Sequence, residues 1–128
     1  MAQVTLTVNM GKKLIAKGIV ERDDIKKALK DNTIVIIAGT TNGYVAEELL
    51  KKIGETGFDK NSFFRGVTIP QGANLNELLG KAFNIASVKD VVIEKGKWIK
   101  DKTIYDVIET LKEGDIVLKG ANVVDLVN

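Results

Sequence analysis

The sequence contains no cysteine and no histidine, and these two absences remove several kinds of chemistry. Without cysteine there is neither a disulfide scaffold nor a thiolate nucleophile. Without histidine the chain lacks the commonest general base and the commonest metal ligand. We therefore expect no bound metal and no cofactor. The same absences argue against an enzyme without excluding one.

Long apolar runs and an excess of one charge are also missing. No stretch approaches the length of a membrane span, and Met1–Thr5 does not resemble the start of a signal peptide. Lysine and arginine number 19 against 17 acidic residues, a net charge of +2. Such a small excess does not indicate a nucleic-acid-binding surface. We expect a cytoplasmic protein that binds neither membranes nor nucleic acid.

The composition that remains is typical of one folded domain. Hydrophobic residues make up 45% of the chain, charged residues 28%, and there is a single proline. A chain of 128 residues can bury about two-thirds of the surface it exposes when unfolded. Residues 1–128 are therefore predicted to form a single α/β domain.

A strand, a polar turn and a helix stand at the centre of the sequence. Thr33–Ala38 is almost continuously apolar and rich in β-branched residues, which is typical of a parallel strand buried on both faces. Tyr44–Ile53 carries apolar residues at helical spacing. Between them, Gly39–Gly43 would leave free backbone N–H groups at the start of the helix, where anions bind favourably.

Three further elements are predicted before this unit. Gln3–Val8 alternates apolar and polar residues, as a strand with one buried face does. Asn9 is a suitable N-cap for a helix over Met10–Lys17, which Gly18 would end. Arg22–Lys30 has the pattern of a second helix, with acidic residues in its first turn.

The second half of the chain continues the alternation of strands and helices. The predicted elements are a strand at Phe63–Ile69, a helix at Asn74–Phe83, a hairpin within residues 90–100, a helix at Thr103–Leu111 capped by Thr103 or Asp101, and a buried strand at Asp115–Leu118. Such alternation predicts an open, mainly parallel, Rossmann-like sheet with helices on both faces and an antiparallel hairpin at its margin.

Two polar turns follow apolar strands and would share one rim of this sheet if the strands are neighbours. Ligands of such sheets bind beyond the carboxyl ends of the strands. Hydroxyls, free N–H groups and a lysine suit a phosphate with an attached polyol. The predicted ligand-binding residues are Gly39, Thr40, Thr41, Asn42, Gly43, Lys119, Gly120 and Asn122. The alternative is structural: the first turn would only cap a helix, and Lys119 would lie in solvent.

Three short blocks resemble a known superfamily. The Gly-Thr-Thr-Asn turn within Gly39–Leu49 resembles the phosphate-binding loop of the superfamily that contains type A ribose-5-phosphate isomerase, glucosamine-6-phosphate deaminase, the CoA transferases and the sensing domains of DeoR-type repressors. Lys119–Asp125 is similar to the Asp-Gly-Ala-Asp-Glu-Val-Asp loop of the isomerase. With Leu14–Lys17, both blocks are similar to uncharacterised archaeal and bacterial members. The resemblance implies a phosphate- or phosphosugar-binding domain.

This chain departs from the isomerase pattern at two positions of the second block. Lys119 and Asn122 stand where the isomerase has carboxylates, and an asparagine cannot act as a general acid or base. The first hypothesis is therefore binding of a phosphorylated small molecule. The second is an isomerase-like enzyme in which Lys119 and Asp125 are catalytic. The third is a structural or oligomerisation module that has lost the site.

Members of the superfamily that this chain resembles continue well beyond the second block, whereas this sequence ends three residues after Asp125. We expect either a naturally short form or a piece of a longer protein. In both cases the strand near Leu118 would lack a neighbour, which favours pairing with a second chain and hence a homo-oligomer.

Overall fold

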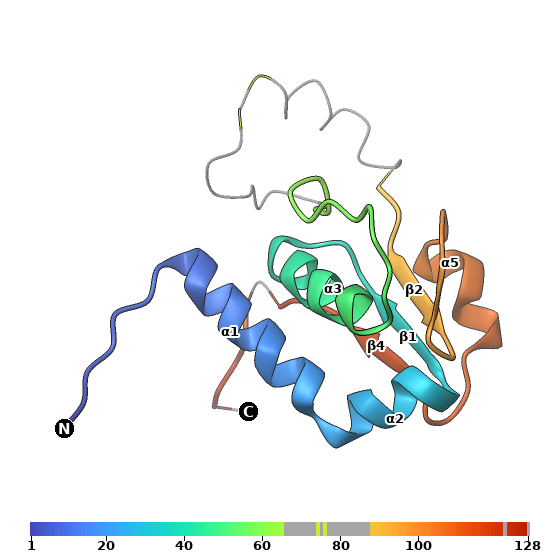
Figure 1. Ribbon diagram of the computed structural model, residues 1–128, viewed down its shortest axis with the longest axis horizontal. Helices are drawn as coiled ribbons and strands as arrows, with labels where there is room; N and C mark the ends of the chain where they lie inside the picture. Colours follow the sequence, from blue (N-terminus) through green and yellow to red (C-terminus); the bar gives the residue numbers. More distant parts are fainter. Residues whose placement is uncertain (66–73, 75, 77–87, 122, 128) are drawn as a thin grey trace.

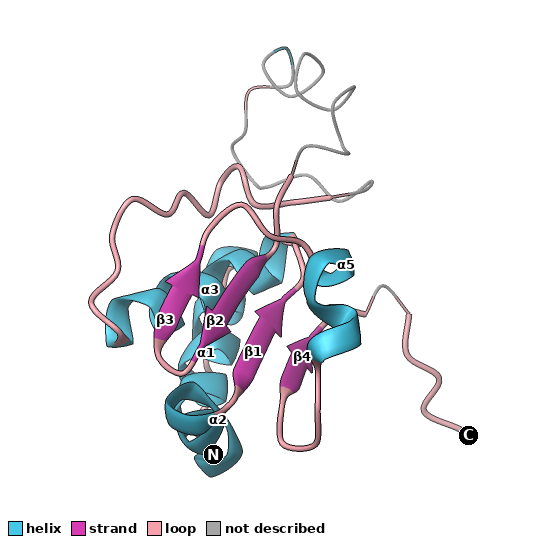
Figure 2. Cartoon of the chain, turned by 90° about the vertical axis from the view of Figure 1, so that its right-hand side faces the viewer, coloured by secondary structure: helices cyan, strands magenta, loops and turns pink. Residues whose placement is uncertain are grey.

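The computed structural model describes residues 1–65, 74, 76, 88–121 and 123–127, and these form a four-stranded mixed sheet with helices on both faces (Figures 1 and 2). The strands are β1 (Thr33–Ile36), β2 (Val91–Glu94), β3 (Lys97–Ile99) and β4 (Ile116–Leu118), in the order β3-β2-β1-β4. The helices are α1 (Val8–Glu21), α2 (Asp23–Asp31), α3 (Thr40–Lys52) and α5 (Ile104–Val107), which continues into the 3₁₀ turn η2 (Ile108–Thr110).

The prediction of an α/β sheet covered on both faces is confirmed, but the prediction of a mainly parallel sheet is wrong. Strand β1 pairs antiparallel with β2, and β2 pairs antiparallel with β3. Only the β1–β4 pair is parallel. A continuous apolar run such as Ile34–Ile36 indicates that both faces of the strand are buried. A strand buried on both faces is equally apolar whether its neighbours are parallel or antiparallel, so the run does not predict strand direction.

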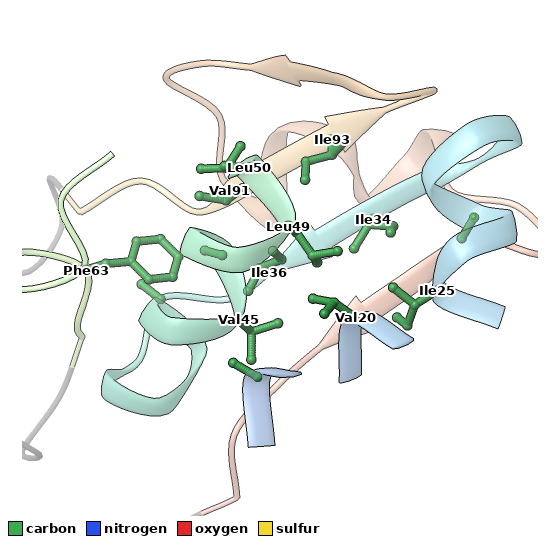
Figure 3. Close-up of a cluster of buried hydrophobic side chains, with 14 residues drawn as sticks. Val20, Ile25, Ile34, Ile36, Val45, Leu49, Leu50, Phe63, Val91 and Ile93 are labelled. Atoms are coloured by element: carbon green, nitrogen blue, oxygen red, sulfur yellow. The ribbon is translucent and has the colours of Figure 1, made fainter. Parts of the chain in front are cut away.

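Alternate residues of β1 point into two apolar layers. Ile34 and Ile36 face the layer formed with α1, α2 and α3 (Figure 3). Val35 faces the opposite layer, where it packs with Val107 of α5. All three β1 side chains are fully buried. The larger layer also contains Leu49 of α3, so α3 is held directly against the centre of the sheet.

The predicted strand at Gln3–Val8 is wrong, and the first helix is longer than expected. Residues 1–7 are exposed and form no regular structure, because the described chain offers them no partner strand. The helix cap is Thr7, whose hydroxyl accepts a hydrogen bond from Met10 N at 3.2 Å, and not Asn9. Helix α1 continues through Gly18 to Glu21, since burial of Val20 against α3 outweighs the weak helix propensity of one glycine.

The elements around β1 follow the sequence prediction closely. Helix α2 begins one residue after the predicted Arg22 and buries Ile25 and Ala28. Helix α3 begins at Thr40, so the residues predicted as a turn after Gly39 form its first helical turn. The Gly-Thr-Thr-Asn-Gly segment is therefore one extended residue followed by a helix.

The hairpin and the cap of α5 are confirmed. Lys95 and Gly96 both have positive φ, 47° and 76°, which matches the two-residue turn that best joins twisted antiparallel strands. Thr103 and Asp106 form a capping box at the start of α5. The predicted helix to Leu111 is wrong in length, because regular α-helix ends at Val107 and is followed by η2.

Strand β4 is an edge strand and not the buried strand predicted at Asp115–Leu118. Its side chains are only partly covered, and Val117 is 46% exposed. The predicted strand at Phe63–Ile69 is wrong over residues 63–65, which form no strand, and its remainder lies outside the described residues. The predicted helix at Asn74–Phe83 lies almost entirely outside them as well.

Asp115 joins the start of β4 to the start of β1. Its Oδ1 accepts hydrogen bonds from Thr33 N at 2.8 Å and from Asn32 Nδ2 at 3.3 Å, and its Oδ2 accepts one from Lys112 N at 2.8 Å. Partial burial alone would raise the pKa of this carboxyl. The hydrogen bonds from Thr33, Lys112 and Asn32 outweigh burial and lower the pKa of Asp115 below its ordinary value.

This lowered pKa predicts an acid-sensitive contribution to stability. Ionised Asp115 stabilises the fold fully above its unfolded pKa of about 3.9, and the contribution is lost as pH falls through the folded pKa. Wild type should be more stable than Asp115→Asn at neutral pH, and the difference should shrink below about pH 4. Urea denaturation at several pH values measures it.

The control for this experiment is Asp31→Asn. Asp31 is exposed, and its side chain makes no hydrogen bond within the described part of the chain. This variant should change the free energy of unfolding at neutral pH by about 0.5 kcal/mol or less. A constant difference between wild type and Asp115→Asn from neutral pH to about pH 2.5 would contradict the prediction.

Candidate functional site

The two segments predicted to share a rim of the sheet do meet. Strands β1 and β4 are parallel neighbours, with Ile36 opposite Leu118. The segments that follow the two strands therefore begin at the same end of the sheet. Beyond the paired residues, Ile37 N donates to Leu118 O at 3.0 Å. The Nδ2 of Asn42 donates to Ile37 O at 2.8 Å and to Leu118 O at 2.9 Å. The first turn of α3 is therefore fastened to the end of β4.

The N-terminus of α3 presents free hydrogen-bond donors at this rim. Gly39 is the N-cap, with extended backbone at φ 178° and ψ 155°, and provides no side-chain cap. In the described part of the chain, the N–H groups of Thr40, Thr41 and Asn42 donate to no acceptor. These groups carry the positive end of the helix dipole. The two threonine hydroxyls, both half-buried, add donors that can rotate.

A lysine from another helix completes this end of α3. Lys12 of α1 is half-buried, and its Nζ donates to Thr40 Oγ1 at 3.0 Å. Sequence reasoning missed Lys12, which lies 28 residues before Thr40 and has no motif around it. Only the packing of α1 along α3, visible in Figure 1, brings the ammonium group to the helix N-terminus.

Two of the predicted ligand-binding residues have structural roles in this geometry. Asn42 is 7% exposed, and its amide N–H groups are directed at the two strand carbonyls. Gly43 is buried where a Cβ would lie 3.0 Å from Lys60 O, so a larger residue would fit only if the chain that covers α3 moved by a few tenths of an ångström. Of the first turn, Gly39, Thr40 and Thr41 remain available to a ligand.

The second predicted segment is more exposed. Lys119 Nζ donates to the neighbouring Gly120 O at 2.8 Å, and both residues are exposed. Asn122 lies outside the described residues. Asp125 is exposed and accepts a hydrogen bond from Val127 N at 2.9 Å. Burial is one way to activate a lysine as a base, and Lys119 is exposed here. A catalytic role for Lys119 and Asp125 stays a prediction.

A buried carboxylate beside the rim was also missed. Asp90 precedes β2, and its side chain is fully buried. Its Oδ1 accepts from Ala38 N at 2.9 Å and from Arg65 Nη2 at 3.0 Å, and its Oδ2 accepts from Ile104 N at 2.8 Å. Asp90 therefore fixes the residue before Gly39, the start of α5 and the guanidinium of Arg65. Its place directly before an apolar strand was the only sequence signal.

Comparisons of this chain with protein-family models, with curated proteins and with solved structures found no match. The resemblance to the ribose-5-phosphate isomerase-like superfamily therefore stays a prediction. Within the described residues, no helix has both the length and the apolar character needed to cross a membrane. The same residues contain no cluster of three or more acidic side chains placed to hold a metal ion.

Proposed function

We propose that this chain is a binding domain for a phosphorylated small molecule, a sugar phosphate in the first instance, with its phosphate site at the N-terminus of α3. The observation that carries the proposal is the contact of Lys12 Nζ with Thr40 Oγ1, at a helix end that has no side-chain cap. Free N–H groups, the helix dipole and a cation converge there, and each of them favours an anion.

The remaining groups suit the arrangement of a phosphate. Phosphate oxygens would accept hydrogen bonds from the N–H groups of Thr40 and Thr41 and from their hydroxyls, while Lys12 would neutralise charge. Extended Gly39 has no side chain, so a ligand can approach the backbone closely. Lys119 and Asn122, on the segment after β4, would contact the sugar. The proposal concerns binding and includes no reaction.

Thermal unfolding with added ligands tests this function. Inorganic phosphate, ribose 5-phosphate and glucosamine 6-phosphate should raise the melting temperature, whereas ribose without phosphate should not. A ligand at a hundred times its dissociation constant stabilises the folded state by about 2.7 kcal/mol. If no phosphorylated ligand shifts the transition at millimolar concentration, the proposed function is wrong.

The residue-level prediction is that Lys12→Gln weakens phosphate binding about tenfold, roughly 1.4 kcal/mol, because one charge-assisted hydrogen bond is removed. Lys13→Gln is the matched control: it removes the same charge from the next residue of α1, which is exposed. Isothermal titration calorimetry gives both affinities. An equal loss of phosphate affinity in the two variants would show that phosphate is attracted by the overall charge of the protein and not by a site at Lys12.

A further inference from the structure

Helix α1 has a second apolar face that nothing in the described chain covers. Its inner face buries Ala16 and Val20 against the core. On the opposite side, four large side chains are exposed, namely Val8 (63%), Met10 (52%), Leu14 (59%) and Ile15 (51%). At about 100° per residue, these positions, Gly11 and Gly18 lie on one side of the helix, which also carries Glu21 in its last turn.

The residues before α1 extend this apolar surface. Val4 and Leu6 are 78% and 44% exposed, and they alternate with polar Gln3, Thr5 and Thr7. This arm leaves the body on the side where α1 begins, and it pairs with no strand of the described chain (Figure 1). We name the side chains of Val4, Leu6, Val8, Met10, Leu14 and Ile15 the arm–α1 surface.

The size of the arm–α1 surface matches half of a dimer interface. A large apolar side chain that is more than half exposed leaves on the order of 100 Å² uncovered. Five of the six side chains are more than half exposed and Leu6 is 44% exposed, so the surface is on the order of 600 Å², the lower end of the roughly 600–1,000 Å² that each partner buries in a stable complex. The largest apolar patch on a monomeric protein is typically about 300–600 Å² and is often functional, so a surface at the top of this range is a candidate interaction site.

The features of the surface favour a second copy of this chain as that partner. A Cβ added at Gly11 or Gly18 would meet nothing within 4 Å, so another helix can approach α1 closely at both positions. In an antiparallel pair, the positive N-terminal end of each α1 lies beside the negative C-terminal end of the other.

We propose that the protein is a homodimer in which the arm–α1 surfaces of two copies pack against each other about a two-fold axis, with the α1 helices antiparallel. A two-fold interface uses the same surface on both copies, so one apolar patch is sufficient. Lys12 lies on the inner side of α1, where it contacts Thr40, so the phosphate site and the dimer interface use different faces of one helix.

Sedimentation velocity at micromolar concentrations tests the proposal on wild type and on Leu14→Lys combined with Ile15→Lys. Wild type should sediment as a dimer, and the double variant as a monomer with an unchanged circular dichroism spectrum. The control is Tyr105→Lys with Ile108→Lys, which removes two exposed apolar side chains, 79% and 54% exposed, from the other face of the sheet. This control should remain a dimer.

A second measurement uses the absence of cysteine from the chain. Under mild oxidation, Leu14→Cys should give a disulfide-linked dimer in high yield, and Tyr105→Cys should not. A monomeric wild type, or a dimer that survives both lysine substitutions at residues 14 and 15, would overturn the proposal. A monomer that co-sediments with phosphatidylglycerol vesicles would overturn it too and assign the surface to a membrane.

Discussion

Replacing Asp90 by alanine is expected to lower the free energy of unfolding by about 3–5 kcal/mol. The side chain of Asp90 is fully buried and accepts hydrogen bonds from two backbone N–H groups and one guanidinium. Its removal leaves the N–H groups of Ala38 and Ile104 without an acceptor and deprives Arg65 of its counter-ion. Breaking a buried ion pair from one side costs far more than the net value of the pair.

Two further variants separate this mechanism from a loss of side-chain volume. Asp90→Asn keeps the shape but offers one carbonyl oxygen in place of two carboxylate oxygens. It should therefore lower the free energy of unfolding by less than Asp90→Ala does. Asp31→Ala removes an exposed carboxylate and should change stability by about 0.5 kcal/mol or less. Urea denaturation measures all three. A loss below about 1 kcal/mol for Asp90→Ala would show that the hydrogen bonds are not needed.

The second large effect is expected at Asn42, where alanine should lower the free energy of unfolding by about 1–3 kcal/mol. The amide of Asn42 is the side-chain link between α3 and the carbonyls of Ile37 and Leu118, at 2.8 and 2.9 Å. Without it, the Ile37 carbonyl loses a hydrogen-bond partner in a partly buried place, and the end of β4 is held less firmly.

This variant also distinguishes two roles of the same residue. The sequence predicts that Asn42 binds the ligand, whereas the geometry gives its N–H groups to the protein backbone. Thr41→Ala, in the same helical turn, is the control and should leave stability nearly unchanged, because Thr41 makes no side-chain hydrogen bond within the described residues. If Asn42→Ala leaves stability intact but abolishes the response to phosphate, the original prediction for Asn42 is correct.

The candidate site could be predicted only in part, and the reason differs from residue to residue. The Gly39–Thr41 turn was found because an apolar strand followed by glycine, hydroxyls and a helix pattern is a local arrangement. Lys12 and Asp90 were missed because each acts through a partner distant in the sequence, 28 residues away for Lys12 and 52 for Asp90. A lone lysine or aspartate carries no local pattern that distinguishes it from a surface charge.

The sequence by itself determined the parts of this protein that depend on neighbouring residues. The buried character of β1, the amphipathic helices α2 and α3, the two-residue turn at Lys95–Gly96 and the cap at Thr103 follow from local sterics and from the period of the apolar residues. These forces act over a few residues, so a sequence of the right pattern is sufficient to specify them.

Only the tertiary structure decided the direction of the strands, the absence of a strand at residues 3–7 and the continuation of α1 through Gly18. Strand β2 enters the sheet antiparallel to β1, which the apolar content of Ile34–Ile36 does not encode. Residues 3–7 alternate as a strand does but remain unpaired, because a strand needs a neighbour to receive its backbone hydrogen bonds. Helix α1 passes through Gly18 because packing on α3 stabilises it, and the same packing places Lys12 at Thr40.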